Sequence, residues 1–141
     1  MQKTATTEEN KVVYRRFIQE IFNEGRLERL NDLVSPSYTL RDAPPGTQSG
    51  PEAIRQIVLM FREGFPDLHI TLEELVAEGK LVAARSTFRG THHGTIFGLK
   101  PTGKKVSMPG LTMVHIVEGK LVESWVRNDV MGLMRQLESQ S

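Results

Sequence analysis

The chain has 141 residues, the size of one ordinary domain with a core and a small pocket. Its 18 Lys and Arg residues and 17 Asp and Glu residues leave a formal charge of +1, and the basic cluster Lys100, Lys104 and Lys105 is small. Because nucleic-acid binding needs a broad basic face, no nucleic-acid partner is expected. The absence of cysteine excludes disulfides, thiolate metal sites and a thiol nucleophile.

The start of the chain is polar and lacks the apolar segment of a signal peptide. No window approaches the roughly 18 consecutive apolar residues of a membrane span, so no membrane partner is expected. We therefore expect a cytoplasmic protein with a single domain over residues 1–141, of which residues 1–6 form a disordered tail.

Helical patterns fill the first part of the chain. Residues 6–9, Thr-Thr-Glu-Glu, fit a capping box, and the helix they begin should end near Gly25. Apolar spacing over residues 27–34 predicts a short second helix, closed by Pro36 before an extended stretch at residues 37–42.

A Pro/Gly loop at residues 43–50 precedes a third helix, which begins at Pro51 and stops at Gly64. Alternating apolar residues and turn residues then predict a run of strands and a last short helix. These lie near residues 68–72, 81–91, 105–117 and 121–128 for the strands and 131–137 for the helix. Helices followed by antiparallel strands indicate an α+β domain with the helices on one face of the sheet.

Three stretches carry a resemblance to a known family: FPDLHITLEELVAEGK at 65–80, RSTFRGTHHGTIFGLKPTGKKV at 85–106 and HIVEGKLVESWVRNDVMGLMRQL at 115–137. In this order and spacing they resemble the SnoaL-like polyketide cyclases of the nuclear transport factor 2-like superfamily. The resemblance covers nearly the whole chain. It implies a cone-shaped, mostly antiparallel curved sheet wrapped around N-terminal helices, an apolar pocket, chemistry without a cofactor, and a homodimer.

The resemblance also places the acid and base of the family. In members that close rings by aldol condensation, an Asp moves the proton and a His assists it, and the shared turn puts these positions at Val126 and Thr112. Neither side chain can transfer a proton near neutral pH. Asp129 corresponds to a second, later Asp of the family, and Arg41 stands where many relatives carry a histidine.

Strand alternation assigns faces to the last hairpin. A three-residue turn at residues 117–119 puts Thr112 and Val126 on one face. That face also carries Val114, Ile116, Val122 and Ser124 and is expected to line the pocket. The other face carries Met113, His115, Leu121, Glu123, Trp125 and Arg127, a mixture that suits an interface or solvent.

Asp129 and His92 are the candidate catalytic residues. Asp129 lies between strand and helix, where burial would favour acid/base work, but an Asp before a helix is also a common N-cap. His92 matches the histidine of the GTH motif of the family, and a loop histidine bonded to backbone is the alternative. His115 reads as a structural or interface histidine. Arg85 and Arg89 share a strand face and could hold a substrate carboxylate or pair with Glu73 and Glu74.

Two functions stay open. The first is a cofactor-independent cyclase or isomerase that shifts a proton next to a carbonyl in a small apolar molecule, with Asp129 or His92 as acid/base and Thr112, Val114, Ser124 and Val126 in the substrate pocket. The second is a noncatalytic dimer that binds such a molecule. No three or four ligands converge in the pattern, so no metal is expected.

Overall fold

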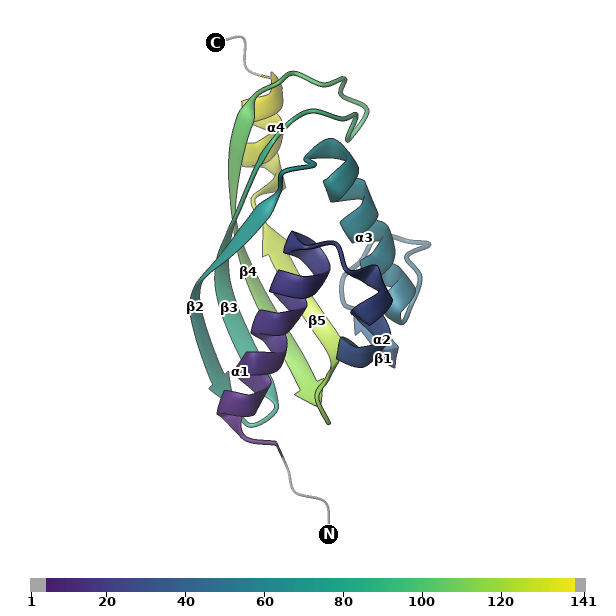
Figure 1. The fold of residues 1–141 in the computed structure, drawn as a ribbon, viewed down its shortest axis with the longest axis vertical. Helices are drawn as coiled ribbons and strands as arrows, with labels where there is room; N and C mark the ends of the chain where they lie inside the picture. The colour runs from purple at the N-terminus through teal and green to yellow at the C-terminus, as the bar shows by residue number, and fades with distance from the viewer. Residues whose placement is uncertain (1–4, 139–141) are drawn as a thin grey trace.

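The computed structural model describes residues 5–138 and shows a strongly curved sheet with helices across its concave face (Figure 1). The sheet has five strands in the order β1-β5-β4-β3-β2. Strand β1 runs parallel to β5, and the other neighbours are antiparallel. The strands are β1 (Val34–Leu40), β2 (His69–Glu78), β3 (Leu81–Thr91), β4 (Lys105–Val117) and β5 (Lys120–Asn128). The expected α+β class and curved sheet are confirmed.

Four α-helices, one π-helical segment and one 3-10 turn are present in the described residues. They are α1 (Thr7–Arg16), the π-helical segment η1 (Phe17–Asn23), the 3-10 turn η2 (Leu27–Arg29), α2 (Leu30–Leu33), α3 (Pro51–Gly64) and α4 (Val130–Glu138). Helix α1 packs against β2 and β3, α3 against β1, and α4 against β4. None of the described helices is long and apolar enough to cross a membrane.

Helix α1 begins with the capping box expected from the sequence. The Thr6 hydroxyl accepts a hydrogen bond from the Glu9 amide at 3.0 Å, and the Glu9 carboxylate accepts one from the Thr6 amide at 3.2 Å. Of the tail expected over residues 1–6, Thr6 is therefore the N-cap, and residues 1–4 lie outside the described part of the chain. The helix continues as η1, a wider π-type turn of the kind often found at functional sites.

Strand β1 corrects the expectation that Pro36 closes the second helix. The helix ends at Leu33, and β1 begins at Val34 and passes through Pro36. Because β1 is the edge strand, the missing N–H of proline leaves no inner hydrogen bond unmade.

The β4–β5 hairpin has a shorter turn than expected. Val117 pairs with Lys120, so the turn has two residues, Glu118 and Gly119, both with positive φ. Such a turn alone would reverse the predicted faces. A bulge at Val122 adds one residue and restores them, so Thr112 still pairs with Val126. The expectation was wrong at one point, because Leu121 faces the core in place of Val122.

Two groups of buried side chains form the core. The larger lies between the sheet and the N-terminal helices and includes Ile21, Leu30, Val82 and Val114. The smaller lies under α4 and the end of α3 and includes Phe65, Met108 and Leu133. Between them the concave face of the sheet is not filled by side chains.

Candidate active site

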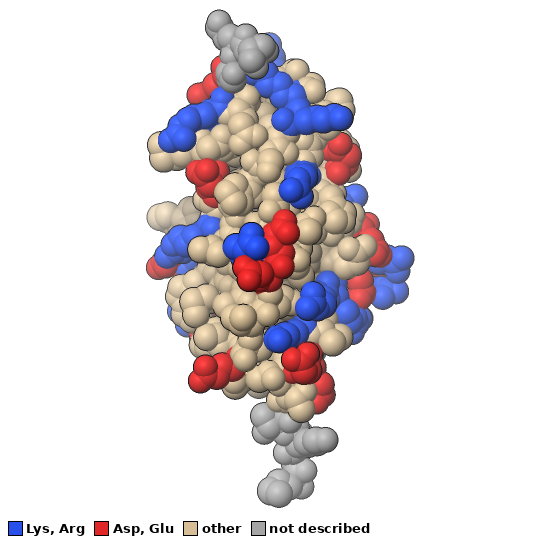
Figure 2. Space-filling model, turned by 90° about the vertical axis from the view of Figure 1, so that its left-hand side faces the viewer, with Lys and Arg blue, Asp and Glu red and all other residues tan. Residues whose placement is uncertain are grey.

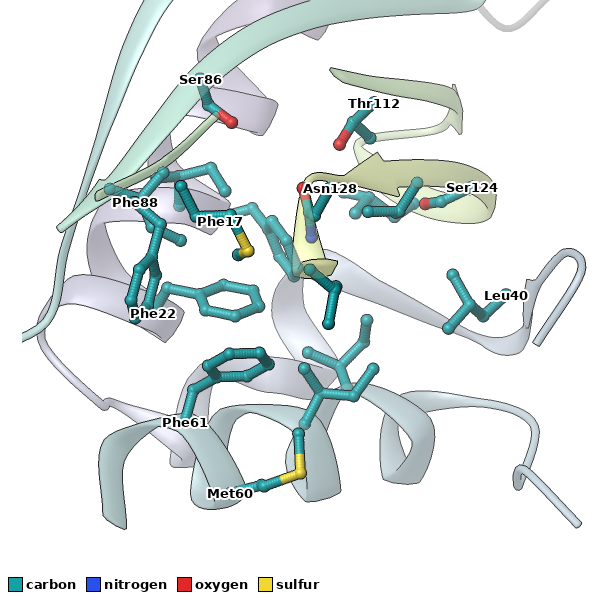
Figure 3. Close-up of a pocket in the computed structure, with 18 of the residues that line it drawn as sticks. Phe17, Phe22, Leu40, Met60, Phe61, Ser86, Phe88, Thr112, Ser124 and Asn128 are labelled. Atoms are coloured by element: carbon teal, nitrogen blue, oxygen red, sulfur yellow. The ribbon is translucent and has the colours of Figure 1, made fainter. Parts of the chain in front are cut away.

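A cavity of about 410 Å³ lies between the concave face of the sheet and the helices. Its wall is formed mainly by aromatic and aliphatic side chains from α1, η1, α3 and the sheet (Figure 3). Exposed lining residues surround its mouth, and these are Pro44, Met60, Phe97, Asn128 and Val130. This volume suits a small organic molecule held in a partly open pocket.

Aromatic rings form one wall of the cavity. Phe61 of α3 lies 5.5 Å from Phe88 and 6.0 Å from Phe97, measured between ring centroids. Both contacts are edge to face, which is a favourable arrangement. Phe97 has a φ of 54°, a backbone conformation that costs free energy in an aromatic residue. The loop after β3 thus holds an aromatic ring at the mouth.

Six uncharged polar side chains interrupt this apolar wall: Tyr14, Tyr38, Ser86, Thr112, Ser124 and Asn128. Within the described residues, no Asp, Glu, His, Lys or Arg lines the cavity. The site can therefore donate and accept hydrogen bonds but holds no charged side chain.

The two tyrosines come from α1 and β1 and are buried, with exposed fractions of 5% and 1%. Burial raises the pKa of Tyr14 to about 12, although the hydroxyl of Thr112 beside it lowers that pKa. Burial also raises the pKa of Tyr38, and the hydroxyl of Ser124 lowers it. Both phenols consequently stay protonated near neutral pH and are hydrogen-bond donors.

Three of the four expected substrate-binding residues line the cavity: Thr112, Ser124 and Val126. Thr112 and Val126 are direct partners across β4 and β5. The fourth, Val114, is fully buried in the larger core and lies outside the lining, because helix side chains cover it.

Asp129 lies outside the cavity. Its side chain is exposed, and its Oδ1 accepts a hydrogen bond from the backbone amide of Gly132 at 2.9 Å. This is the geometry of an N-cap for α4, the alternative raised from the sequence. The structure therefore does not bring Asp129 to the pocket that the catalytic role requires.

His92 also lies outside the cavity, so it is not the pocket polar group expected from the sequence. It is fully buried, and its Nδ1 accepts a hydrogen bond from the backbone amide of Thr102 at 3.2 Å. Its Nδ1 also lies 3.0 Å from Thr102 Oγ1, and its buried Nε2 has no hydrogen-bond partner within the described residues. Its ring packs 5.7 Å from that of Phe65. His92 thus joins the two ends of the loop that carries Phe97.

The outer, convex face of the sheet carries the remaining charged candidates. His115 Nδ1 lies 2.7 Å from Glu123 Oε1, and Arg41 Nε lies 2.8 Å from Glu123 Oε2. The hydrogen bond to His115, and then that to Arg41, hold the pKa of Glu123 below its ordinary value. Arg85 pairs with Glu74 at 2.8 Å, which is one of the two alternatives raised from the sequence. No group of three or more His, Asp or Glu residues in the described chain could hold a metal.

Sequence reasoning missed Tyr14, Tyr38, Ser86 and Asn128. The two tyrosines occupy positions that an apolar pattern reads as core, since periodicity does not distinguish a core from a cavity wall. Asn128 had a usable signal, because the alternation through Ser124 and Val126 reaches it two residues later.

The domain is α+β, and its curved sheet and helices enclose an apolar cavity with a few uncharged polar groups. This is the architecture of a small-molecule enzyme or binding protein of the cone-fold class. The family model described as SnoaL-like polyketide cyclase matches residues 12–137. The chain belongs to the SnoaL-like polyketide cyclase family.

Named relatives agree with this assignment. Nogalonic acid methyl ester cyclase of Streptomyces nogalater is 32% identical over 82% of this chain and 88% of its own sequence. Aklanonic acid methyl ester cyclase AcmA of Streptomyces galilaeus is 30% identical over 84% of this chain and 83% of its own. Among solved structures, TsrD of Streptomyces laurentii has a TM-score of 0.86 at 28% identity, with 95% of this chain and 98% of TsrD covered.

Proposed function

We propose that the protein is a cofactor-independent cyclase or isomerase that acts on a small apolar carbonyl compound inside the cavity. The observation that carries the proposal is the cavity itself, about 410 Å³ of mainly apolar wall with six uncharged hydrogen-bonding side chains. The names of the curated relatives favour this enzyme over the noncatalytic binder considered from the sequence.

The uncharged wall supports a neutral substrate. A free carboxylate brought into this cavity would lose water and meet no Lys or Arg in the described lining, which is costly. The relatives are named for methyl esters of polyketide acids, in which the carboxylate charge is masked. We therefore propose a polyketide methyl ester, or a ketone of similar polarity, as the substrate class.

The chemistry we propose is an intramolecular aldol ring closure. A C–H bond beside a carbonyl gives its proton to a solvent base, and the resulting enolate carbon forms a bond to a second carbonyl carbon. The oxygen of that second carbonyl takes up one proton, so product and substrate have the same mass.

Two effects of the cavity would accelerate this reaction. The aromatic walls hold the two carbons in the ring-closing geometry. Neutral donors, with Tyr14 beside Thr112 and Tyr38 beside Ser124, stabilise the oxygen on which charge develops.

Turnover of nogalonic acid methyl ester and aklanonic acid methyl ester tests the proposal. We expect time-dependent conversion to a ring-closed isomer. Chromatography separates this isomer from the substrate, and mass spectrometry shows that the two have the same mass. Val126→Trp, which fills the cavity, should abolish conversion, whereas Val117→Trp on the exposed end of β4 should not. Recovery of both esters unchanged at high protein concentration would refute the proposal.

We also propose a homodimer formed through the outer face of the sheet. Figure 2 shows the side of the molecule on which β2, β3 and β4 lie, and uncharged surface extends over much of it around paired basic and acidic groups. Val76, Leu111 and Met113 on these strands are exposed by 64%, 60% and 46%. Apolar side chains so exposed support a surface that a second copy covers.

The cytoplasmic location, the absence of a cofactor and the catalytic roles of Asp129 and His92 stay predictions. For the last, turnover by an Asp129→Asn variant is the direct measurement.

A further inference from the structure

A polar row crosses three neighbouring strands near the mouth of the cavity. Ser86 of β3 pairs with Gly110 of β4, and Gly110 pairs with Asn128 of β5. Because directly paired residues face the same side of a sheet, all three face the cavity, and Ser86 and Asn128 belong to its lining. Figure 3 shows the Asn128 side chain directed into the space between the sheet and α3.

Gly110 makes this arrangement possible. A Cβ atom at position 110 would lie 2.1 Å from Asn128 Oδ1 and 3.6 Å from Ser86 Oγ. The first distance is far below van der Waals contact, so the carboxamide oxygen of Asn128 occupies the space that any other residue at position 110 would need. The Asn128 amide group is thereby turned towards the cavity.

The donors of this row are unused by the described protein. The neighbouring side chains make their hydrogen bonds on the outer face, Thr87 to Glu73 and Arg127 to Asp42. No residue in the described range 5–138 makes a side-chain hydrogen bond to Ser86 or Asn128. An amide and a hydroxyl that converge on an apolar pocket without a protein partner can bind a ligand oxygen.

From this geometry we propose that Asn128 and Ser86, on either side of Gly110, form a subsite that binds a carbonyl oxygen of the cavity ligand. The inference deepens the proposed function and rests on it for the identity of the natural substrate. Thr112 lies two residues along β4 from Gly110, about 7 Å at the rise of an extended strand. The subsite thus binds a second oxygen, separate from the one beside Tyr14 and Thr112.

A matched pair of probes tests the subsite without any turnover. 9-Fluorenone and fluorene share a ring system and differ by one carbonyl group. Asn128→Ala should weaken fluorenone binding by about threefold to tenfold, the effect of one neutral hydrogen bond, and leave fluorene binding within about twofold. Titration calorimetry measures both dissociation constants. Thr87 follows Ser86 in β3 and faces outward, so Thr87→Val should change neither constant.

Gly110→Ala supplies a second, independent variant. Its methyl group should displace Asn128 and reproduce the selective loss of fluorenone binding, whereas in the Asn128→Ala background it should add less than about twofold. Thermal unfolding shows whether each variant is folded. Equal loss for both probes, no loss for either, or no binding of fluorenone to the unaltered protein would overturn the subsite. A protein that binds fluorenone selectively but turns over no ester would refute the proposed function and leave the subsite standing.

Discussion

Val126 and Thr112 face each other across β4 and β5 at the positions where the family resemblance places an acid and a base. Both line the cavity, so the position at which the resemblance expects an acid lies within the pocket and carries valine. The groups left there to assist catalysis are neutral donors, and among them Tyr14 stays protonated because burial raises its pKa to about 12.

Tyr14→Phe should lower kcat of the proposed ring closure by about a hundredfold, because it removes one donor from the oxygen that gains charge. The ring itself is kept, so KM and the midpoint of thermal unfolding should change little. Steady-state kinetics with nogalonic acid methyl ester measure both constants. An unchanged kcat would show that the Tyr14 hydroxyl has no part in the reaction.

Asp129→Asn should keep turnover within about twofold of the unaltered protein, because asparagine caps a helix as well as aspartate does. Asp129→Ala should lower the stability of the fold by about 1 kcal/mol through loss of the bond to the Gly132 amide. Kinetics and thermal unfolding of the two variants separate the roles. A hundredfold loss of turnover in the asparagine variant would support Asp129 as a catalytic acid or base.

At the scale of elements, the β4–β5 hairpin combines a two-residue turn with a bulge at Val122. Deleting Val122 should leave every pair between the strands in place and shift the unfolding midpoint by less than about 5 °C. Deleting Val126 should turn Arg127 towards the cavity and abolish cooperative unfolding, because the faces of the strand end are exchanged. Circular dichroism melts compare the two deletions. Equal stability of both would contradict the register.

Turn residues and alternation were enough to predict β3 and β4 at their observed bounds, since glycine and charged turns mark both ends of each strand. Strand β1 was misjudged at Pro36, because a proline stops a helix and an inner strand but is accepted at a sheet edge. The bulge at Val122 left no local signal. Because the bulge adds the residue that the short turn lacks, the predicted pocket face was still correct at Thr112, Ser124 and Val126.

The site was predictable only in part for a related reason. Thr112, Ser124 and Val126 of the hairpin were found because strand alternation fixes a face. Tyr14 and Tyr38 come from α1 and β1, and only the three-dimensional arrangement brings them to the same cavity. The positions of Asp129 and His92 outside the cavity were likewise open from the sequence. Their hydrogen bonds to the backbone amides of Gly132 and Thr102 match the N-cap and loop-histidine alternatives, but only the three-dimensional arrangement decides between these and the pocket.

For the whole molecule, the outer face of the sheet combines exposed apolar side chains with ion pairs such as Arg85 with Glu74. Met113→Arg should place an unpaired charge in the proposed twofold interface and yield a monomer at micromolar concentration. Light scattering gives the mass, and Val12→Arg on the exposed side of α1 is the control. A monomeric unaltered protein would contradict the dimer.

The pH dependence of ring closure tests the central claim, that the cavity accelerates the reaction through neutral donors. No described lining side chain titrates between pH 5 and 9, because burial holds the pKa of Tyr14 near 12 and raises that of Tyr38. The ratio of kcat/KM to the uncatalysed rate constant of the same ester should therefore stay constant over this range. A ratio that follows a bell or a titration step would reveal an ionising acid or base of the protein and contradict the account.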